Sequence, residues 1–317
     1  MRIWEADMRP EDQQFAYWRE VLCEAFVSLD PVIKPQAAPF LGRVHSQDLY
    51  QTAQTQICSR GQFINRRWEE IRRNPVEYCF ANFQLEGSCV VRQDGQETLV
   101  SPGGFAVVDS TRPYYLDFRE DWRVLSFRIP RSQLVSRLAS PRQAMAHAIG
   151  GQTGLGLVAS RFASSLGQVN PGAGIDVQEG LSTTLNSIIA LTLGATLESQ
   201  ERDRLSLRDA FRRAIETYIS DHLADPLLGP DAIALRFGVS RRTIYGLFED
   251  APLSVSGLIR EQRLLRSARD LQAPGCRSIL AIAMRWGFND ASHFSRLFKS
   301  RFGVSPREFV SQRRAEQ

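Results

Sequence analysis

The stretch Ile282-Ala283-Met284-Arg285-Trp286-Gly287 decides the fold of the C-terminal third, because a close copy of it occurs earlier in the chain. The earlier copy is Ile233-Ala234-Leu235-Arg236-Phe237-Gly238, a shift of 49 positions, and Leu247-Phe248 returns at a shift of 50 as Leu297-Phe298. In each copy a short apolar helix precedes a glycine turn, a polar segment and a second helix that carries aromatic residues. This is the order of a helix-turn-helix, whose second helix enters the major groove of DNA. The repeat predicts two such units, at about 231–250 and 279–303.

The charge of the chain is unevenly distributed. Residues 208–317 contain 18 Arg and Lys against 12 Asp and Glu, a net charge of +6, whereas residues 1–207 contain 21 against 23, a net charge of −2. A basic segment beside a mildly acidic one is typical of a nucleic-acid-binding protein. A solvated surface can carry the same charge, so the pattern supports the repeat without replacing it.

The length and composition predict a soluble protein of about two domains. The chain has 317 residues, of which 43% are hydrophobic and 23% charged, as in ordinary globular proteins. The first seven residues carry charges where a signal peptide needs an apolar core. The best apolar run, 188–193, is far shorter than the roughly 18–20 residues of a membrane span. We therefore expect a cytoplasmic protein without membrane contact.

The cysteines do not predict a metal or disulfide site. They are scattered and nowhere spaced Cys-x-x-Cys; they are Cys23, Cys58, Cys79, Cys89 and Cys276. Two of them, Cys79 and Cys89, lie in strand-like segments and are expected to be core thiols.

Short β-strand signals follow one another between about residues 40 and 130. Asp94-Gly95, between the segments 88–92 and 97–100, is a strong hairpin signal. Strands are also expected at 76–85, at 105–108 and from Tyr114 and Arg123, after a first helix at 11–29. Together they predict a small antiparallel barrel or sandwich in an α+β protein.

Helical patterns replace the strands after Pro130. Helices are expected at 132–138, 141–149 and 155–166, and a glycine-rich break at 170–174 precedes a long helix at about 176–197. That helix carries an apolar stripe of Val177, Leu181, Leu185, Ile188, Ile189 and Leu193. Packing on the barrel is the favoured interpretation of the stripe, and a dimer interface is the alternative. The predicted boundaries are a domain at 1–197 (barrel about 40–130, helices about 131–197), a linker at 198–207 and a DNA-binding domain at 208–317.

The second helix of each repeat has a face for the core and a face for DNA. Ile244, Leu247 and Phe248 share one side of the first, and Phe294, Leu297 and Phe298 share one side of the second, so both sets are predicted to be buried. Between the two units, a connecting helix at 254–271 is expected to bury Leu258, Ile259, Leu265, Ala268 and Leu271. The residues then predicted to face DNA are Ser240, Arg241, Arg242, Tyr245, Asn289, Ser292, His293, Ser295, Arg296 and Lys299.

Arginine is the residue that most often reads a base. Arg242 and Arg296 suit bidentate pairing with guanine, although a solvated charge is the simpler alternative for each. Ser240 is expected to cap its helix, and the free N–H groups beside it suit a phosphate. His293 has no Cys, His or carboxylate at ligand spacing, so no metal is predicted there.

The segment 279–309 resembles the signature of AraC/XylS-type transcription regulators. The residues that carry the resemblance are Ile282-Ala283, Gly287-Phe288, Ser292-His293-Phe294-Ser295-Arg296, Phe298-Lys299, Phe302-Gly303 and Ser305-Pro306-Arg307. The resemblance covers about 205–313 and implies seven helices, with recognition helices one DNA turn apart, roughly 34 Å. It adds Arg307 to the DNA-contacting residues. Gly246 departs from the polar or basic residue that the family often has there.

More distantly, residues 1–200 resemble the cupin-like effector domain of the same family. The segment 102–110, followed by Arg112-Pro113-Tyr114, carries the likeness, with Gly104 in place of a common acidic residue. The resemblance implies a ligand-responsive, sequence-specific DNA-binding transcription regulator, more often an activator in this family. It also implies a small effector in the barrel, a homodimer and, for an activator, contact with RNA polymerase. Residues considered for a pocket that takes an aromatic or acidic ligand are Arg66, Arg67, Tyr78, Phe80, Arg92, Tyr114, Tyr115 and Trp122; a role in the core or on the surface is the alternative for each.

Other functions were weighed against this one. A cupin enzyme needs about three metal ligands, and His45 is the only histidine in the barrel region, so neither a metal nor another cofactor is expected. A cysteine-dependent enzyme fused to the same module needs an activated thiol, which no cysteine here has the setting for. The remaining alternative keeps DNA binding but makes a protein partner or oligomer exchange the signal.

Overall fold

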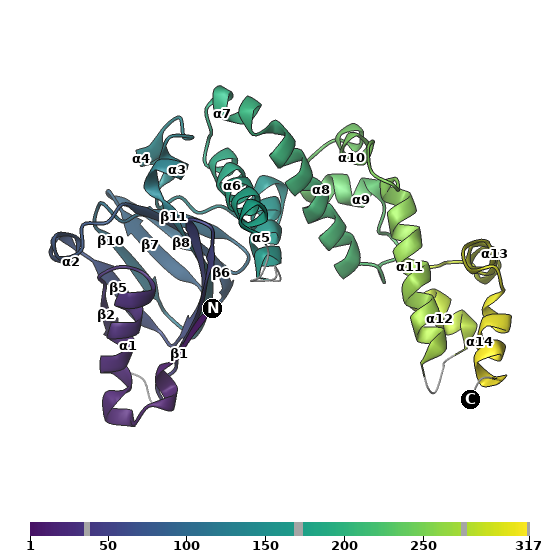
Figure 1. Ribbon diagram of the computed structural model, residues 1–317, viewed down its shortest axis with the longest axis horizontal. Coiled ribbons are helices and arrows are strands. Elements are labelled where there is room, and N and C mark those ends of the chain that lie inside the picture. The colour runs from purple at the N-terminus through teal and green to yellow at the C-terminus, as the bar shows by residue number, and fades with distance from the viewer. Residues whose placement is uncertain (35–38, 168–173, 274–277, 316–317) are drawn as a thin grey trace. The chain divides into compact units, whose positions relative to one another are not determined.

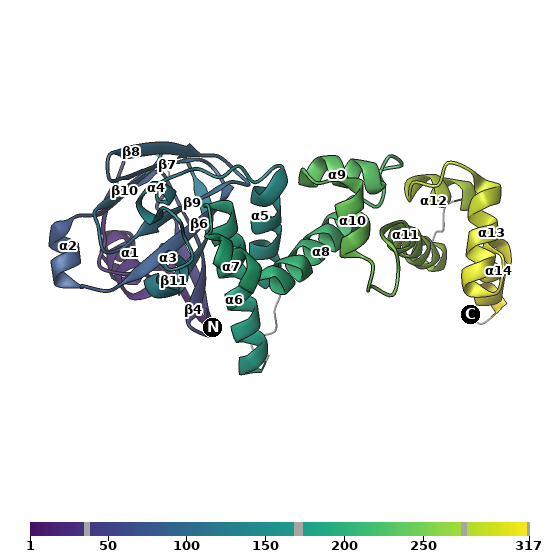
Figure 2. The ribbon, with the colours of Figure 1, turned by 90° about the horizontal axis from the view of Figure 1, so that it is seen from above.

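The computed structural model describes residues 1–34, 39–167, 174–273 and 278–315, drawn from two directions in Figures 1 and 2. Cys276 and most of the predicted glycine-rich break, 170–173, lie outside these residues. The chain divides into two compact units, Met1–Ala210 and Phe211–Gln317.

The first unit contains two antiparallel sheets that face each other across an apolar core (Figure 1). The six-stranded sheet has the order β1 (Arg2–Glu5), β3 (Gly42–Leu49), β4 (Thr52–Ser59), β11 (Trp122–Pro130), β6 (Tyr78–Glu86), β9 (Phe105–Asp109). The five-stranded sheet has the order β2 (Asp30–Ile33), β5 (Gln62–Arg66), β10 (Tyr114–Phe118), β7 (Cys89–Gln93), β8 (Gln96–Val100). The predicted antiparallel, cupin-like β fold is therefore confirmed, in the form of a sandwich.

The hairpin at Asp94-Gly95 is confirmed in detail. Asp94 has φ 51° and Gly95 has φ 78°, and the flanking Gln93 and Gln96 are paired in register. Two successive positive φ angles define the type I′ turn, whose twist matches that of the strands it joins.

One side of the sandwich is covered by α1 (Glu11–Ala25), which follows the short helix η1 (Ala6–Met8). Its buried residues Trp18, Val21, Leu22 and Ala25 recur at helical spacing. The indole N–H of Trp18 donates to Gln62 Oε1 at 3.1 Å, so the buried ring also satisfies its polar atom. Another short helix, α2 (Trp68–Arg73), follows β5.

The helices after the sheets are α3 (Arg131–Val135), α4 (Pro141–Ala144), α5 (Gly154–Leu166), α6 (Ile175–Thr192) and α7 (Leu197–Arg202). The prediction of one helix at 141–149 was wrong beyond Ala144. Residues Ala146 and Ile149 instead donate backbone N–H groups to Val107 and Phe105 of β9, each at 2.8 Å. β9 is the last strand of its sheet, so the carbonyl groups on its open edge need hydrogen-bond donors. The N–H groups of Ala146 and Ile149 supply them, and this pairing replaces the helix.

The predicted apolar stripe is only partly buried in α6. Leu185, Ile188 and Ile189 are buried, whereas Val177 is 54% exposed. The helix ends at Thr192, five residues before the predicted end, and Gly194 follows with φ 91°. The segment predicted as a linker lies in α7 and the start of α8.

All the regular structure described in the second unit is helical. Its elements are α8 (Arg204–Asp221), which begins in the first unit, α9 (Pro230–Phe237), α10 (Arg241–Leu247), α11 (Val255–Gln272), α12 (Ile279–Arg285), α13 (Ala291–Phe302) and α14 (Pro306–Ala315). These are the seven helices that the resemblance implies. Within the described residues, no helix combines the length and apolar character needed to cross a membrane.

Candidate DNA-binding surface and sandwich cavity

The turns of the two helix-turn-helix units have the same geometry. Gly238 has φ 64° after α9, and Gly287 has φ 73° after α12. In both turns the next residue closes the helix with the same bond: Val239 N–H to Ala234 O and Phe288 N–H to Ala283 O, each at 3.0 Å. Such bonds require the left-handed conformation that glycine adopts most easily. The repeated sequence thus encodes a repeated structure.

The one-residue slip of the repeat lies in the turn. Ser240 caps α10, accepting the N–H of Thr243 at 3.1 Å, as predicted. Asp290 caps α13, accepting the N–H groups of Ser292 at 2.8 Å and His293 at 3.2 Å. The cap therefore comes two residues after the turn glycine in the first helix-turn-helix and three residues after it in the second helix-turn-helix.

The buried faces of both recognition helices match the prediction, with one partial exception. Ile244, Leu247 and Phe248 are buried, and Phe294 and Phe298 are both 0% exposed. Leu297 is half-buried. The opposite faces are consequently turned away from the core.

The outward face of α10 presents Arg241, Arg242, Thr243 and Tyr245, all exposed. Arg241 is partly engaged, because it pairs with Asp231 at 3.1 Å and donates to Tyr245 Oη at 3.2 Å. The hydrogen bond to Tyr245 and the charge of Asp231 raise the pKa of Arg241. Thr243, which was not among the predicted residues, is exposed as well, and its hydroxyl lies 2.9 Å from that of Ser240.

The outward face of α13 presents Ser292, His293, Arg296 and Lys299, again exposed. Ser295 is less available than predicted, since it is half-buried and its hydroxyl donates to Ala291 O at 2.8 Å. Asn289 in the turn and Arg307 in α14 are exposed as well. Across the residues described, Arg242 and Arg296 form no ion pair, which leaves both guanidinium groups free to bind a ligand.

Gly246 lies in α10, where an added Cβ would meet no atom within 4 Å. We expect Gly246→Ala to stabilise the second unit by about 0.5–1 kcal/mol, because alanine loses less backbone entropy in a helix. Hydrogen exchange of the α9–α10 segment measures this change. Gly287→Ala should instead destabilise the unit. Gly287 has a positive φ, and an added Cβ would lie 2.8 Å from the Arg263 guanidinium. Equal protection of the two variants would contradict the prediction.

Arg263 of α11 links the segment after α8 to the turn of the second helix-turn-helix unit and was missed by sequence reasoning. Its guanidinium donates to Leu223 O at 3.0 Å and Asp225 O at 2.5 Å, just after α8, and to Gly287 O at 3.1 Å, in the second turn. Burial lowers its pKa, although an arginine of such high intrinsic pKa stays charged. Its neighbour Leu264 is buried and Leu265 is 46% exposed, so placing Leu265 on the buried face was wrong.

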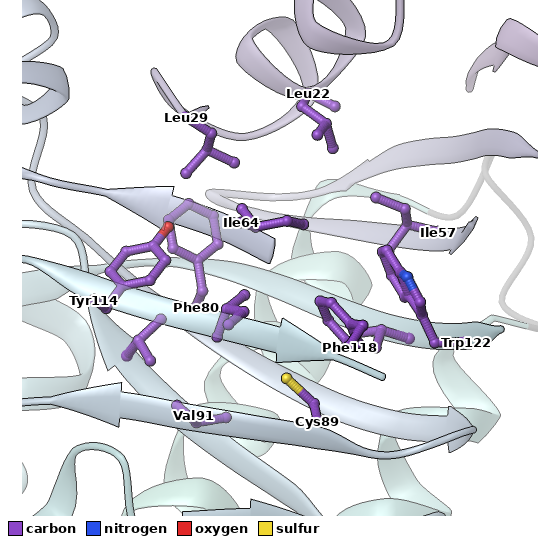
Figure 3. Packing of buried hydrophobic residues seen from close by; sticks show 14 of the residues in the cluster. Leu22, Leu29, Ile57, Ile64, Phe80, Cys89, Val91, Tyr114, Phe118 and Trp122 are labelled. Atoms are coloured by element: carbon purple, nitrogen blue, oxygen red, sulfur yellow. The ribbon is translucent and has the colours of Figure 1, made fainter. Parts of the chain in front are cut away.

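A pocket lies between the two sheets of the first unit, with Leu22 of α1 among the residues that line it. Phe80, Tyr114 and Trp122 line it, as considered for the pocket. The other lining residues are apolar or uncharged: Leu22, Phe26, Leu29, Ile57, Ile64, Asn82, Leu116, Phe118, Val124 and Ser126. Figure 3 shows the stacked rings of Phe118 and Trp122 at one end of this cluster, with Tyr114 and Phe80 at the other.

The arginines considered for this pocket do not line it. Arg66 is fully buried, but its guanidinium donates to the backbone oxygens of Ser110, Ser28 and Asn74 at 2.7–2.9 Å. Arg67 pairs with Asp30 and Arg92 with Glu97, both at the surface.

Nor do two of the tyrosines line the cavity. Tyr78 is half-buried beneath the guanidinium of Arg128, and Tyr115 is exposed.

Three cysteines of the first unit, Cys58, Cys79 and Cys89, lack the setting of a nucleophile. Cys79 and Cys89 are buried core thiols, as predicted. Burial raises the pKa of Cys79 to about 12 and raises the pKa values of Cys58 and Cys89 as well, whereas a reactive thiol needs a lowered pKa. The described part of the chain contains no group of three or more His, Cys, Asp or Glu side chains placed to hold a metal ion.

Both domains match known families. The model of an AraC-binding-like domain matches residues 18–194, and that of a helix-turn-helix domain matches residues 233–312. A protein of Bacillus sp. (strain OxB-1), named "Uncharacterized protein in nit 5′region", is 31% identical over 70% of this chain and 86% of its own length. The transcriptional activator NphR of Rhodococcus sp. is 29% identical over 70% of this chain and 66% of its own length.

A solved structure supports the fold. The AraC-like transcriptional activator CuxR covers 84% of this chain and 94% of its own, with a TM-score of 0.53 and 17% sequence identity. The AraC-binding-like match alone spans more than half of the chain, so it shows the family. Membership of this family replaces the alternative of a cysteine-dependent enzyme. The chain belongs to the AraC family of DNA-binding transcription regulators.

Proposed function

We propose that this regulator activates transcription by reading two DNA half-sites, with α10 in one major groove and α13 in the next, under the control of a small molecule bound between its two sheets. The observation that carries the first part is the pair of equivalent turns, each followed by a helix with one buried face and one outward polar face. A helix with these two faces is what the major groove admits.

The outward side chains divide into two chemical roles. Arg242 and Arg296, free of ion pairs within the described residues, are proposed to read guanine through two parallel hydrogen bonds. Arg241, Lys299 and Arg307 are proposed to contact phosphates, which positions the helices without reading sequence. The hydroxyl, imidazole and amide groups proposed to complete the surface belong to Ser240, Tyr245, Asn289, Ser292, His293 and Ser295.

Activation and control are supported by different observations. NphR, named a transcriptional activator, supports activation, and with it contact with RNA polymerase. The lined cavity in the first unit supports a small molecule as the signal, rather than a protein partner. A homodimer is part of the proposal, because Ile175 and Val177 at the start of α6 are exposed apolar residues; light scattering of the purified protein measures the oligomeric state.

Arg296→Ala is expected to weaken binding to a selected DNA site by about 1–3 kcal/mol and to relax base preference at one position. The reason is the loss of a bidentate contact with a base edge. Competition binding with single-base variants of the site measures both effects.

Arg301→Ala is the matched control, since it removes the same charge from the same helix. Arg301 is held by Glu261, with Nε at 2.7 Å from Oε1 and 2.9 Å from Oε2, so base preference should not change. If Arg296→Ala and Arg301→Ala behave alike, α13 does not read bases through Arg296.

A further inference from the structure

We infer that the connecting helix α11 binds the sugar-phosphate backbone of the DNA between the two half-sites, with Arg260 as the side chain that contacts a phosphate. The inference rests on the proposed reading of two half-sites by α10 and α13, and it adds a contact in the groove between the two helix-turn-helix units.

Three segments of the second unit form this groove. They are the segment 226–230, which leads into α9, one side of α11, and the turn 287–290 together with His293 and Leu297 of α13. The groove has a volume of about 340 Å³, whereas a single water molecule needs only about 10–15 Å³. A phosphodiester group therefore has room to enter between the two units.

One stripe of α11 faces the groove. The residues of this stripe are Ser256, Ile259, Arg260 and Arg263. Their spacing of i, i+3, i+4 and i+7 places them on one side of the helix. Ile259 and Arg263 are buried, whereas Ser256 and Arg260 are exposed. The exposed pair is therefore the part of the stripe that a ligand in the groove meets.

The groove shares exposed residues with the face of α13 that is proposed to contact DNA. Asn289 and His293 belong to that face, and both also line the groove. In Figures 1 and 2, α11 lies between α10 and α13. On one face of the duplex, two successive major grooves are separated by the minor groove, which has a phosphate strand along each edge. A helix between the two recognition helices therefore faces these strands.

The charges of the groove suit a phosphate. Arg260 makes no ion pair or hydrogen bond with any residue that the structure describes. Asp290 is the acidic residue of the lining, and both its carboxylate oxygens accept N–H groups at the start of α13. Glu261, next to Arg260, is held by Arg301. The buried Arg263 stays charged and adds to the positive potential.

A phosphate contact at this place positions the protein without reading sequence. Because Arg260 lies on the helix that joins the two units, its contact would hold the DNA between the half-sites against the protein. The two recognition helices would then engage their grooves in one register. The expected signature is a loss of affinity that is the same for every base sequence and that depends on salt.

Arg260→Ala is expected to lower the affinity for DNA with both selected half-sites about five- to tenfold at 0.1 M salt. The slope of log affinity against log salt should fall by about 0.9, which is the counterion release of one phosphate contact. Arg260→Lys keeps the charge and should keep the slope. Arg269→Ala is the matched control, since Arg269 is exposed on the same helix but two and a half turns away, on the opposite side. Its affinity should change less than about twofold.

Neutral methylphosphonate linkages, placed one at a time between the half-sites, locate the contact. At the contacted phosphate the linkage should weaken the parent protein by the same factor as Arg260→Ala and should not weaken that variant further. An unchanged salt slope in Arg260→Ala, or losses that add at every linkage, would overturn the inference. Lost transcription in vitro at full DNA affinity would also overturn it, in favour of a protein partner.

The outcome for Arg260 is separate from the outcome for the reading of bases. If the parent protein shows no base preference but Arg260→Ala still lowers the salt slope, the proposed reading of half-sites fails and the phosphate contact stands. If Arg296→Ala relaxes base preference while Arg260→Ala changes neither affinity nor slope, base reading stands and the contact at Arg260 fails.

Discussion

Arg263→Met is expected to destabilise the C-terminal unit by about 3–5 kcal/mol, the largest effect of any polar substitution in it. Methionine approximates the length of the side chain but donates no hydrogen bond. The oxygens of Leu223, Asp225 and Gly287 then lose a charged donor, and each buried acceptor without a partner costs about 1–3 kcal/mol.

The same substitution should weaken the cooperation of the two helix-turn-helix units in binding DNA. Arg263 holds the turn of the second helix-turn-helix against the segment that follows α8. Without it, we expect hydrogen exchange to accelerate around Gly287 and the affinity for a two-half-site DNA to fall more than the affinity for one half-site.

Arg266→Met is the control for the loss of charge, because Arg266 is exposed on the same helix. Exposed substitutions of this kind stay within about 0.5 kcal/mol of the parent. If exchange in α11–α13 is the same in both variants, Arg263 does not stabilise the junction.

Phe298→Ala is expected to cost about 3–5 kcal/mol, as large-to-small changes of buried rings do. Phe298 is 0% exposed, and its ring lies 4.5–5.5 Å from the rings of Phe294, Phe302 and Phe309. It therefore joins α13 to α14, and its loss leaves a cavity beneath the recognition helix. Hydrogen exchange of α13 and α14 measures the effect.

Phe298→Leu keeps most of the apolar volume and should cost about 1–1.5 kcal/mol. A graded loss, larger for alanine than for leucine, is expected together with a parallel loss of DNA affinity. Full protection of α13 in the alanine variant would contradict the assignment of this ring as the centre of the packing.

Local signals predicted the parts of the structure that local chemistry controls. The Asp94-Gly95 hairpin, the Ser240 cap and the buried faces at Ile244 and Phe294 depend on turn geometry and periodicity, and the structure confirms them. The repeat was informative because two copies of one glycine turn require the same left-handed residue, first Gly238 and then Gly287.

Long-range contacts explain what the sequence did not predict. Residues 145–149 look helical in isolation, but the open edge of β9 supplies partners for Ala146 and Ile149. Arg263 and Arg66 look like surface charges in the sequence. In the structure each is buried and donates hydrogen bonds to backbone oxygens that are distant in sequence. Polar residues stabilised in this way carry no periodic signal, so the burial of Arg66 and Arg263 was not predicted. On α11 only Leu265 was wrongly placed on the buried face, since Ile259, Ala268 and Leu271 are buried as predicted.

The spacing of the DNA half-sites tests the central claim, that both recognition helices read bases on one face of the duplex. Purified protein is used to select bound sequences from random DNA. We predict two conserved half-sites whose centres lie one helical turn apart, about 10–10.5 base pairs, with affinity lost when five base pairs are inserted between them. A single conserved half-site, or unchanged affinity after the insertion, would contradict the claim.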